Sequence, residues 1–132
     1  MDKKYQKCIL TNMVMIYKDE EILVINRKKS DWPGLSFPGG HVEKDESIEE
    51  SVYREIKEET GLTLNSVKLC AIKEWKREEN NRYLGFLYKS DDFNGNIHFS
   101  KEGEIFWINK KDIDKYPLSD DFEELFELID KA

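Results

Sequence analysis

The chain has 132 residues, of which 39% are hydrophobic and 37% charged, and its formal net charge is −7. This length predicts one domain, residues 1–132, with a single core. Seven Phe, six Tyr and three Trp argue against a disordered chain. The acidic balance argues against binding to nucleic-acid polymers, because phosphate contacts need a basic face.

Features of a secreted or membrane-bound protein are absent from the sequence. The basic start of the chain lacks the apolar segment of a signal peptide, and the longest uncharged apolar run, residues 8–17, is too short to span a bilayer. Cys8 and Cys70 lie in apolar runs and are expected to be buried free thiols. We therefore expect a cytoplasmic protein without membrane partners.

Hydrophobic periodicity and turn residues divide the chain into strands and helices. Strands are expected at residues 8–17, 22–28, 35–37, 64–76, 82–90 and 103–108, with polar turns at 18–21, 77–81 and 91–96. Helices are expected at 47–60 and 110–115, the second capped by Asn109, and in a final segment that Ser119 caps and that runs to about 131. This order predicts an α/β sandwich with a mixed sheet in the middle.

The helix at residues 47–60 has clear start and stop signals. Ser47 is a good N-cap and Glu50 follows three residues later, which forms a capping box. Gly61 is suited to end the helix in the left-handed conformation.

Three carboxylates of this helix, Glu55, Glu58 and Glu59, lie at i, i+3 and i+4 and share one face. Like charges this close repel one another, and a hard cation such as Mg²⁺ removes the penalty. The alternative is a solvated acidic face. The metal interpretation is favoured because a glycine turn at residues 37–40 immediately precedes the cluster and because Arg54 is placed to orient a neighbouring carboxylate.

The stretch from residue 40 to residue 62 resembles the Nudix box, G-x5-E-x7-R-E-U-x-E-E-x-G-U, where U is a bulky aliphatic residue. Every fixed position is filled, by Gly40, Glu46, Arg54, Glu55, Ile56, Glu58, Glu59, Gly61 and Leu62. The resemblance implies an α/β/α sandwich with a central mixed sheet. It also implies a Mg²⁺-dependent hydrolase, with Mn²⁺ as a possible substitute, of a nucleoside diphosphate linked to another group.

Carried over position by position, the resemblance implies a metal site at Glu55, Glu58, Glu59 and the backbone carbonyl of Gly39. Glu55 is our first choice as general base. The second choice is an acid of the segment 100–104, either Glu102, which would also join the metal ligands, or Glu104. An exposed charged turn is the alternative reading of that segment.

Other residues are expected to support or bind rather than react. Arg54 completes the catalytic set by orienting Glu55, and Glu46 holds the loop and the helix in register. Arg27 and Lys28, at the end of a strand, are either phosphate ligands or ordinary surface cations. His41 is expected to be a loop residue, because Mg²⁺ prefers oxygen ligands.

The wider pattern, with Trp32-Pro33-Gly34 before the glycine turn and Gly103-Glu104 after it, resembles the MutT-like branch of the family. That branch includes 8-oxo-dGTP diphosphatases, so oxidised dGTP is the leading candidate substrate. Gly40 and Asp120 are expected at the substrate, Asp120 because it stands just beyond a Pro where that branch reads the base edge. It carries a carboxylate where the bacterial enzyme has an amide, and the alternative is a first-turn acid favoured by the helix dipole.

Three other functions stay open from the sequence alone. They are hydrolysis of another nucleotide derivative such as a nucleotide sugar or a pterin triphosphate, nucleotide sensing without cleavage, and a structural interaction protein with an acidic helix. A small-molecule nucleotide is the expected partner, and the chain is a monomer or a homodimer.

Overall fold

The computed structural model describes residues 4–27, 33–77, 81–98 and 103–132. The strands are β1 (Lys7–Lys18), β2 (Glu21–Arg27), β3 (Gly34–Ser36), β4 (Gly39–His41), β5 (Thr63–Leu64), β6 (Lys68–Arg77), β7 (Asn81–Ser90), β8 (Phe93–Asn94) and β9 (Gly103–Asn109). The helices are α1 (Ile48–Thr60), the 3-10 helix η1 (Lys110–Lys115) and α2 (Phe122–Asp130). The predicted α/β class with a mixed sheet is confirmed.

The central strand β1 organises the sheet, whose main order is β3-β2-β1-β7-β6, with β4 paired to β1 and β9 paired to β2. β1 runs parallel to β7 over ten residue pairs, from Lys7 opposite Asn81 to Ile16 opposite Ser90. Its other partners, β2 and β4, are antiparallel. The short strand β4 thereby places the glycine turn against the middle of β1.

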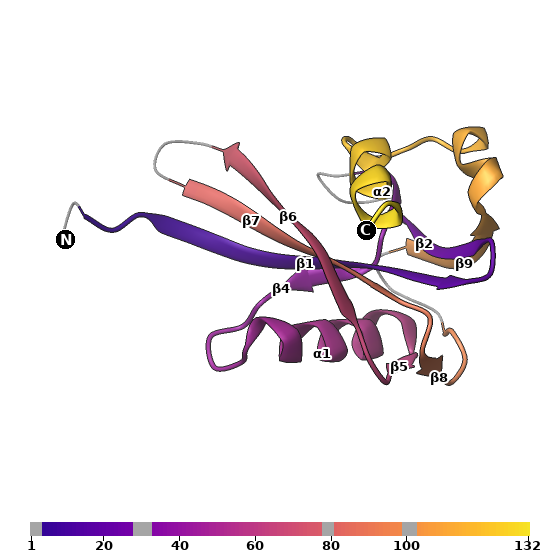
Figure 1. Ribbon diagram of the computed structural model, residues 1–132, viewed down its shortest axis with the longest axis horizontal. Helices are drawn as coiled ribbons and strands as arrows, with labels where there is room; N and C mark the ends of the chain where they lie inside the picture. The colour runs from indigo at the N-terminus through magenta and orange to yellow at the C-terminus, as the bar shows by residue number, and fades with distance from the viewer. Residues whose placement is uncertain (1–3, 28–32, 78–80, 99–102) are drawn as a thin grey trace.

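The helices α1 and α2 cover opposite faces of this sheet (Figure 1). On the α1 face, Val52 and Ile56 are fully buried and pack into one core cluster with Val14 of β1. On the α2 face, Phe122 and Leu125 belong to a second cluster. Its anchor is a stacked pair, Phe122 on Phe37, with ring centroids 4.6 Å apart.

The predicted ends of α1 are confirmed. Ser47 Oγ accepts from Glu50 N at 3.0 Å, and Glu50 Oε1 accepts from Ser47 N at 2.7 Å. Gly61 has a φ of 88° and its N–H donates to Lys57 O. Because both ends are fixed, the carboxylate face has a defined position along the sheet.

The single strand predicted at 64–76 is wrong, since the chain forms two strands there, β5 and β6. Asn65 Nδ2 donates to Asp92 Oδ1 and Asn94 Oδ1, and Ser66 Oγ donates to Asp92 Oδ2. These side chains fix a bend between the strands and pair β5 with β8, which lies within the turn predicted at 91–96.

The cap of the final helix also differs from the prediction. Ser119 does not cap it, because its Oγ donates to Leu35 O at 2.7 Å. The helix begins after Asp121, which has a φ of 66°. Asn109, by contrast, is confirmed as the cap of η1, where its side chain accepts from Lys111 N.

The cysteines are free, as predicted, but they are not buried: Cys8 is exposed and Cys70 is partly exposed. Cys8 lies near the start of β1, and Cys70 lies at an irregularity in the pairing of β6 with β7. Among the described residues, no helix is long and apolar enough to cross a membrane.

Candidate active site

Arg54 is the centre of a hydrogen-bond network that joins α1 to the loop before it. Its Nε and Nη2 donate to the two carboxylate oxygens of Glu46, at 2.8 and 2.6 Å. Nη2 also donates to His41 O, and Nη1 donates to Glu55 at 3.0 Å and to Glu58 at 3.2 Å. One guanidinium therefore orients two carboxylates of the predicted metal face and ties them to β4.

Electrostatics favour the ionised forms of Arg54 and Glu46. The hydrogen bonds from Arg54 and from the backbone N–H of Glu43 lower the pKa of Glu46 to about 2. The same pair with Glu46 is the main reason why the pKa of Arg54 is raised. Glu46 therefore serves as a permanent negative partner, which agrees with its predicted supporting role.

Glu59 lies at the junction of three elements. The residue is 8% exposed, and its Oε1 accepts from Gly39 N of β4 and from Arg27 Nη2 of β2, both at 3.3 Å. Burial of a carboxylate is costly unless it is hydrogen bonded and paired with a cation. These contacts meet that requirement and hold the C-terminal end of the carboxylate face against the glycine turn.

Gly40 allows Glu55 to approach the backbone of β4. A Cβ built on Gly40 would lie 2.4 Å from Glu55 Cδ and 2.5 Å from its Oε2. No L side chain fits there unless the carboxylate moves. The glycine at position 40 is thus a condition for placing the Glu55 carboxylate against β4.

The donor atoms here suit a hard divalent cation, because carboxylate and carbonyl oxygens are what Mg²⁺ prefers. Within the described part of the chain, no three His, Cys, Asp or Glu side chains are gathered as a metal site. Instead Arg54 contacts Glu55 and Glu58, and Arg27 contacts Glu59. The Glu58 side chain is 57% exposed, so it has room to turn from Arg54 toward a cation.

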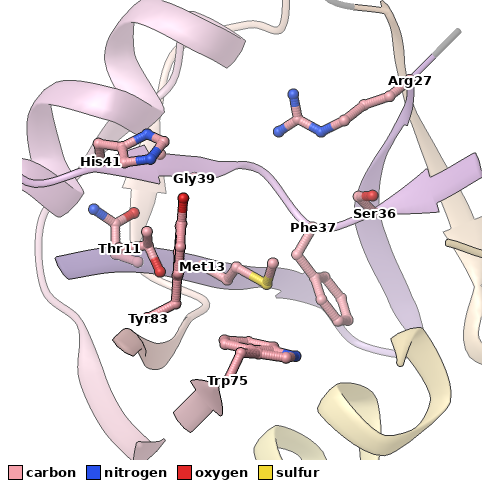
Figure 2. A pocket seen from close by; sticks show the side chains of 11 residues that line it. Thr11, Met13, Arg27, Ser36, Phe37, Gly39, His41, Trp75 and Tyr83 are labelled. Carbon is pink, nitrogen blue, oxygen red and sulfur yellow. The ribbon is translucent and has the colours of Figure 1, made fainter. Parts of the chain in front are cut away.

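A pocket of about 250 Å³ opens beside this network on the other side of the glycine turn. It is lined by Thr11, Asn12, Met13, Arg27, Ser36, Phe37, Gly39, Gly40, His41, Trp75 and Tyr83. In Figure 2 the indole of Trp75 lies below Met13 and Phe37, whereas the side chains of Arg27 and His41 lie above them, on either side of Gly39. One end of the pocket is therefore aromatic and the other is polar, next to the carboxylate face.

The family model described as NUDIX domain matches residues 10–129, which is most of the chain. The chain belongs to the Nudix family. It is 36% identical over 100 residues to an ADP-ribose pyrophosphatase of Methanocaldococcus jannaschii, covering 72% of this chain and 59% of that protein. It is 30% identical over 116 residues to the CTP pyrophosphohydrolase of Escherichia coli, covering 86% and 84%.

A solved structure, the MutT NUDIX hydrolase from Burkholderia pseudomallei, shows the same fold. Its TM-score is 0.80 at 23% identity, with 94% of this chain and 99% of that chain covered. The Nudix box thus lies on the expected fold, and the chain is a Nudix hydrolase.

The structure brings part of the predicted Nudix site together. Glu59 contacts Gly39 and Arg27, and Glu55 lies against Gly40. Glu58 is paired with Arg54, and the metal-binding roles of these carboxylates stay predictions. Lys28 and Glu102 lie outside the described residues, so their predicted roles stay predictions. Glu104 is on β9, exposed and opposite Asn26.

Asp120 is exposed and does not line the pocket of this Nudix hydrolase, whereas Asp121 contacts a residue that does, Trp75. Sequence reasoning also missed Trp75 and Tyr83. Their signal was present in the hairpin predicted around residues 77–81, because it pairs Trp75 with Tyr83 on one face.

Proposed function

We propose that this Nudix hydrolase is a Mg²⁺-dependent pyrophosphohydrolase of nucleoside triphosphates, which it cleaves to a monophosphate and pyrophosphate. The observation that carries the proposal is that the carboxylate network and the aromatic pocket share Arg27, Gly39 and Gly40. A ring system in the pocket therefore places its polyphosphate chain at the carboxylates. The protein has a formal net charge of −7, so a metal site is the expected source of positive charge for the polyphosphate.

The residues would divide the work as follows. Glu55, Glu58 and Glu59, with the carbonyl of Gly39, would hold the Mg²⁺. When bound, that ion supplies charge neutralisation at phosphate oxygens and a lower pKa for an attacking water. In-line displacement at phosphorus otherwise requires positioning, which here falls to Arg54 through Glu55 and to Arg27, our candidate for contacting phosphate.

The general base is Glu55 in this proposal. Arg54 Nη1 holds its carboxylate at 3.0 Å and Gly40 leaves it room beside the glycine turn. Glu104 and Glu102 are the second choice.

Oxidised dGTP is the leading candidate substrate, on the MutT-like pattern of the sequence and on the likeness to a MutT structure. CTP is a second candidate, because the CTP pyrophosphohydrolase of E. coli matches this chain over most of both lengths. A nucleoside diphosphate derivative such as ADP-ribose is a third. The cytoplasm, where free thiols such as Cys8 and Cys70 stay reduced, suits a nucleotide-pool enzyme.

A panel of substrates tests the proposal. Pyrophosphate and phosphate release would be measured with 8-oxo-dGTP, the four dNTPs, CTP, ADP-ribose and a dinucleoside polyphosphate, each with Mg²⁺ and with chelator. Pyrophosphate release from a triphosphate only in the presence of metal supports the proposal. Preference for ADP-ribose would show that the substrate is a nucleoside diphosphate derivative rather than a nucleoside triphosphate. Binding without turnover of any member of the panel would favour a nucleotide sensor.

A further inference from the structure

The indole of Trp75 packs directly against the backbone of the sheet at one end of the pocket. Trp75 lies opposite Tyr83 in the β6–β7 ladder, and its ring leans over Gly85, two residues further along β7. A Cβ built on Gly85 would lie 2.6 Å from Cζ3 of Trp75. The indole therefore rests on glycine backbone, which lets a large flat ring lie close to the sheet at the aromatic end of the pocket.

The outer edge of the same indole is tethered to α2. Trp75 Nε1 donates to Asp121 Oδ2 at 3.0 Å. Asp121 is the N-cap of α2, a position where Asp normally accepts a hydrogen bond from its own helix. Its side chain makes no such bond and the residue has a φ of 66°, so the carboxylate is directed to Trp75 at a cost to the helix.

A second contact joins the same two elements. Lys73 Nζ lies 2.8 Å from Glu124 Oε2 of α2 and 5.4 Å from the centroid of the Trp75 ring. Trp75 lines the pocket and Lys73 does not. Lys73 thus contacts the indole of Trp75 without lining the pocket, so Trp75 remains the aromatic wall of the pocket.

We propose that Asp121 is a positioning residue that fixes Trp75 as a flat wall, on which the planar ring system of the substrate stacks. The inference rests on the proposed nucleotide hydrolase and adds a determinant of its substrate class. Stacking on an aromatic side chain accepts any heteroaromatic ring, because every base has a π face. Substrates with a ring therefore gain from this wall, whereas a ringless polyphosphate does not.

Two substitutions of Asp121 isolate the effect of its hydrogen bond with Trp75. Asp121→Gly and Asp121→Asn each remove one negative charge, and both residues tolerate a positive φ. Only Asn keeps an oxygen that accepts from Trp75 Nε1. Asp121→Gly is expected to raise the KM for a nucleoside triphosphate roughly fivefold, the size of one ordinary hydrogen bond, with a smaller change in kcat. Asp121→Asn is expected to recover most of that loss.

Substitution of the wall itself gives the larger effect. Trp75→Ala is expected to raise the KM for the nucleotide on the order of 10- to 100-fold, the range of base stacking on an aromatic residue. The KM for inorganic tripolyphosphate should change less than twofold by the same stacking argument. Trp75→Phe keeps a ring, is expected to fall between, and provides a folded comparison if the alanine variant is unstable.

Binding is measured separately from turnover by the quenching of tryptophan fluorescence with 8-oxo-dGTP or CTP in chelator. Quenching that is present in the wild type and lost in Trp75→Phe supports the inference, even if no nucleotide is hydrolysed and the proposed function fails. Normal hydrolysis with unchanged KM in Asp121→Gly and Trp75→Phe would overturn the inference and leave the proposed function standing. Equal losses for the nucleotide and for tripolyphosphate would also overturn it.

Discussion

Arg54 donates hydrogen bonds to both carboxylate oxygens of Glu46, from Nε at 2.8 Å and from Nη2 at 2.6 Å. This planar pair lies eight residues apart in sequence and closes the loop between β4 and α1. The remaining nitrogen of Arg54 reaches Glu55 and Glu58. The position of the reactive face of α1 therefore depends on a residue of the loop.

The pair predicts a specific dependence of stability on pH. The pKa of Glu46 is lowered from 4.5 to about 2 by Arg54 and by the backbone N–H of Glu43. Because the pKa of Glu46 is lower in the folded state than in the unfolded state, its ionised carboxylate stabilises the fold. This contribution is fully present above pH 4.5 and is lost as the pH falls toward 2. Thermal unfolding of the wild type and of Glu46→Gln should differ at pH 7, and the difference should shrink between pH 4.5 and pH 2. A difference that stays constant over this range would contradict the assignment.

Alanine substitutions at the two glycines of β4 should cause different defects, one in activity and the other in stability. In Gly40→Ala the new Cβ meets the movable carboxylate of Glu55, so turnover should fall by about 100-fold for a misplaced catalytic group. In Gly39→Ala the Cβ would lie 2.1 Å from the backbone oxygen of Asn12. That clash should destabilise the fold by about 1–3 kcal/mol or more.

Urea unfolding and steady-state kinetics of both glycine variants separate the two effects. Gly40→Ala should unfold close to the wild type, whereas Gly39→Ala should unfold at clearly lower urea. If Gly40→Ala kept full activity, Glu55 would not need its place beside β4.

The ion pair between Arg27 and Glu59 should contribute to stability. Glu59 is 8% exposed, so Arg27→Ala removes a charged partner from a buried carboxylate and should cost about 1–3 kcal/mol. Arg82→Ala is a matched control, because Arg82 pairs with Glu74 on the surface and exposed pairs contribute only about 0–1 kcal/mol. Equal losses of unfolding free energy in the two variants would show that burial of Glu59 has no such effect.

Much of the fold was predictable because its signals are local. Ser47 with Glu50 and Gly61 predicted the two ends of α1. Phe122, Leu125 and Ile129, which are buried in α2, follow the spacing of one helix face. The order of the strands was not predictable, because parallel pairing of β1 with β7 brings together residues more than 70 positions apart. The break between β5 and β6 depends on hydrogen bonds from Asn65 to Asp92 and Asn94, which come close to Asn65 only after folding.

The carboxylate face was predictable and the pocket was not. Glu55, Glu58 and Glu59 share one face of α1 because of their helical spacing, which can be read directly from the sequence. Trp75 and Asp121 are 46 residues apart, and their hydrogen bond depends on how α2 packs above β6. The helix start at Asp121 rather than Ser119 illustrates the same point, because the Ser119 hydroxyl donates to Leu35 on another element.

The most direct test of the central claim is pyrophosphate release from 8-oxo-dGTP and CTP by the wild type, Glu58→Gln and Glu49→Gln, with Mg²⁺ and with chelator. Glu58 belongs to the proposed metal site, whereas Glu49 is an exposed acid in the first turn of the same helix. We expect Mg²⁺-dependent release by the wild type and Glu49→Gln. Glu58→Gln should lose about 100-fold or more of the rate, the order of general catalytic losses. Its unfolding free energy should stay within about 0.5 kcal/mol, because the side chain is more than half exposed. Near-normal turnover by Glu58→Gln would contradict the claim that this face of α1 holds the catalytic metal.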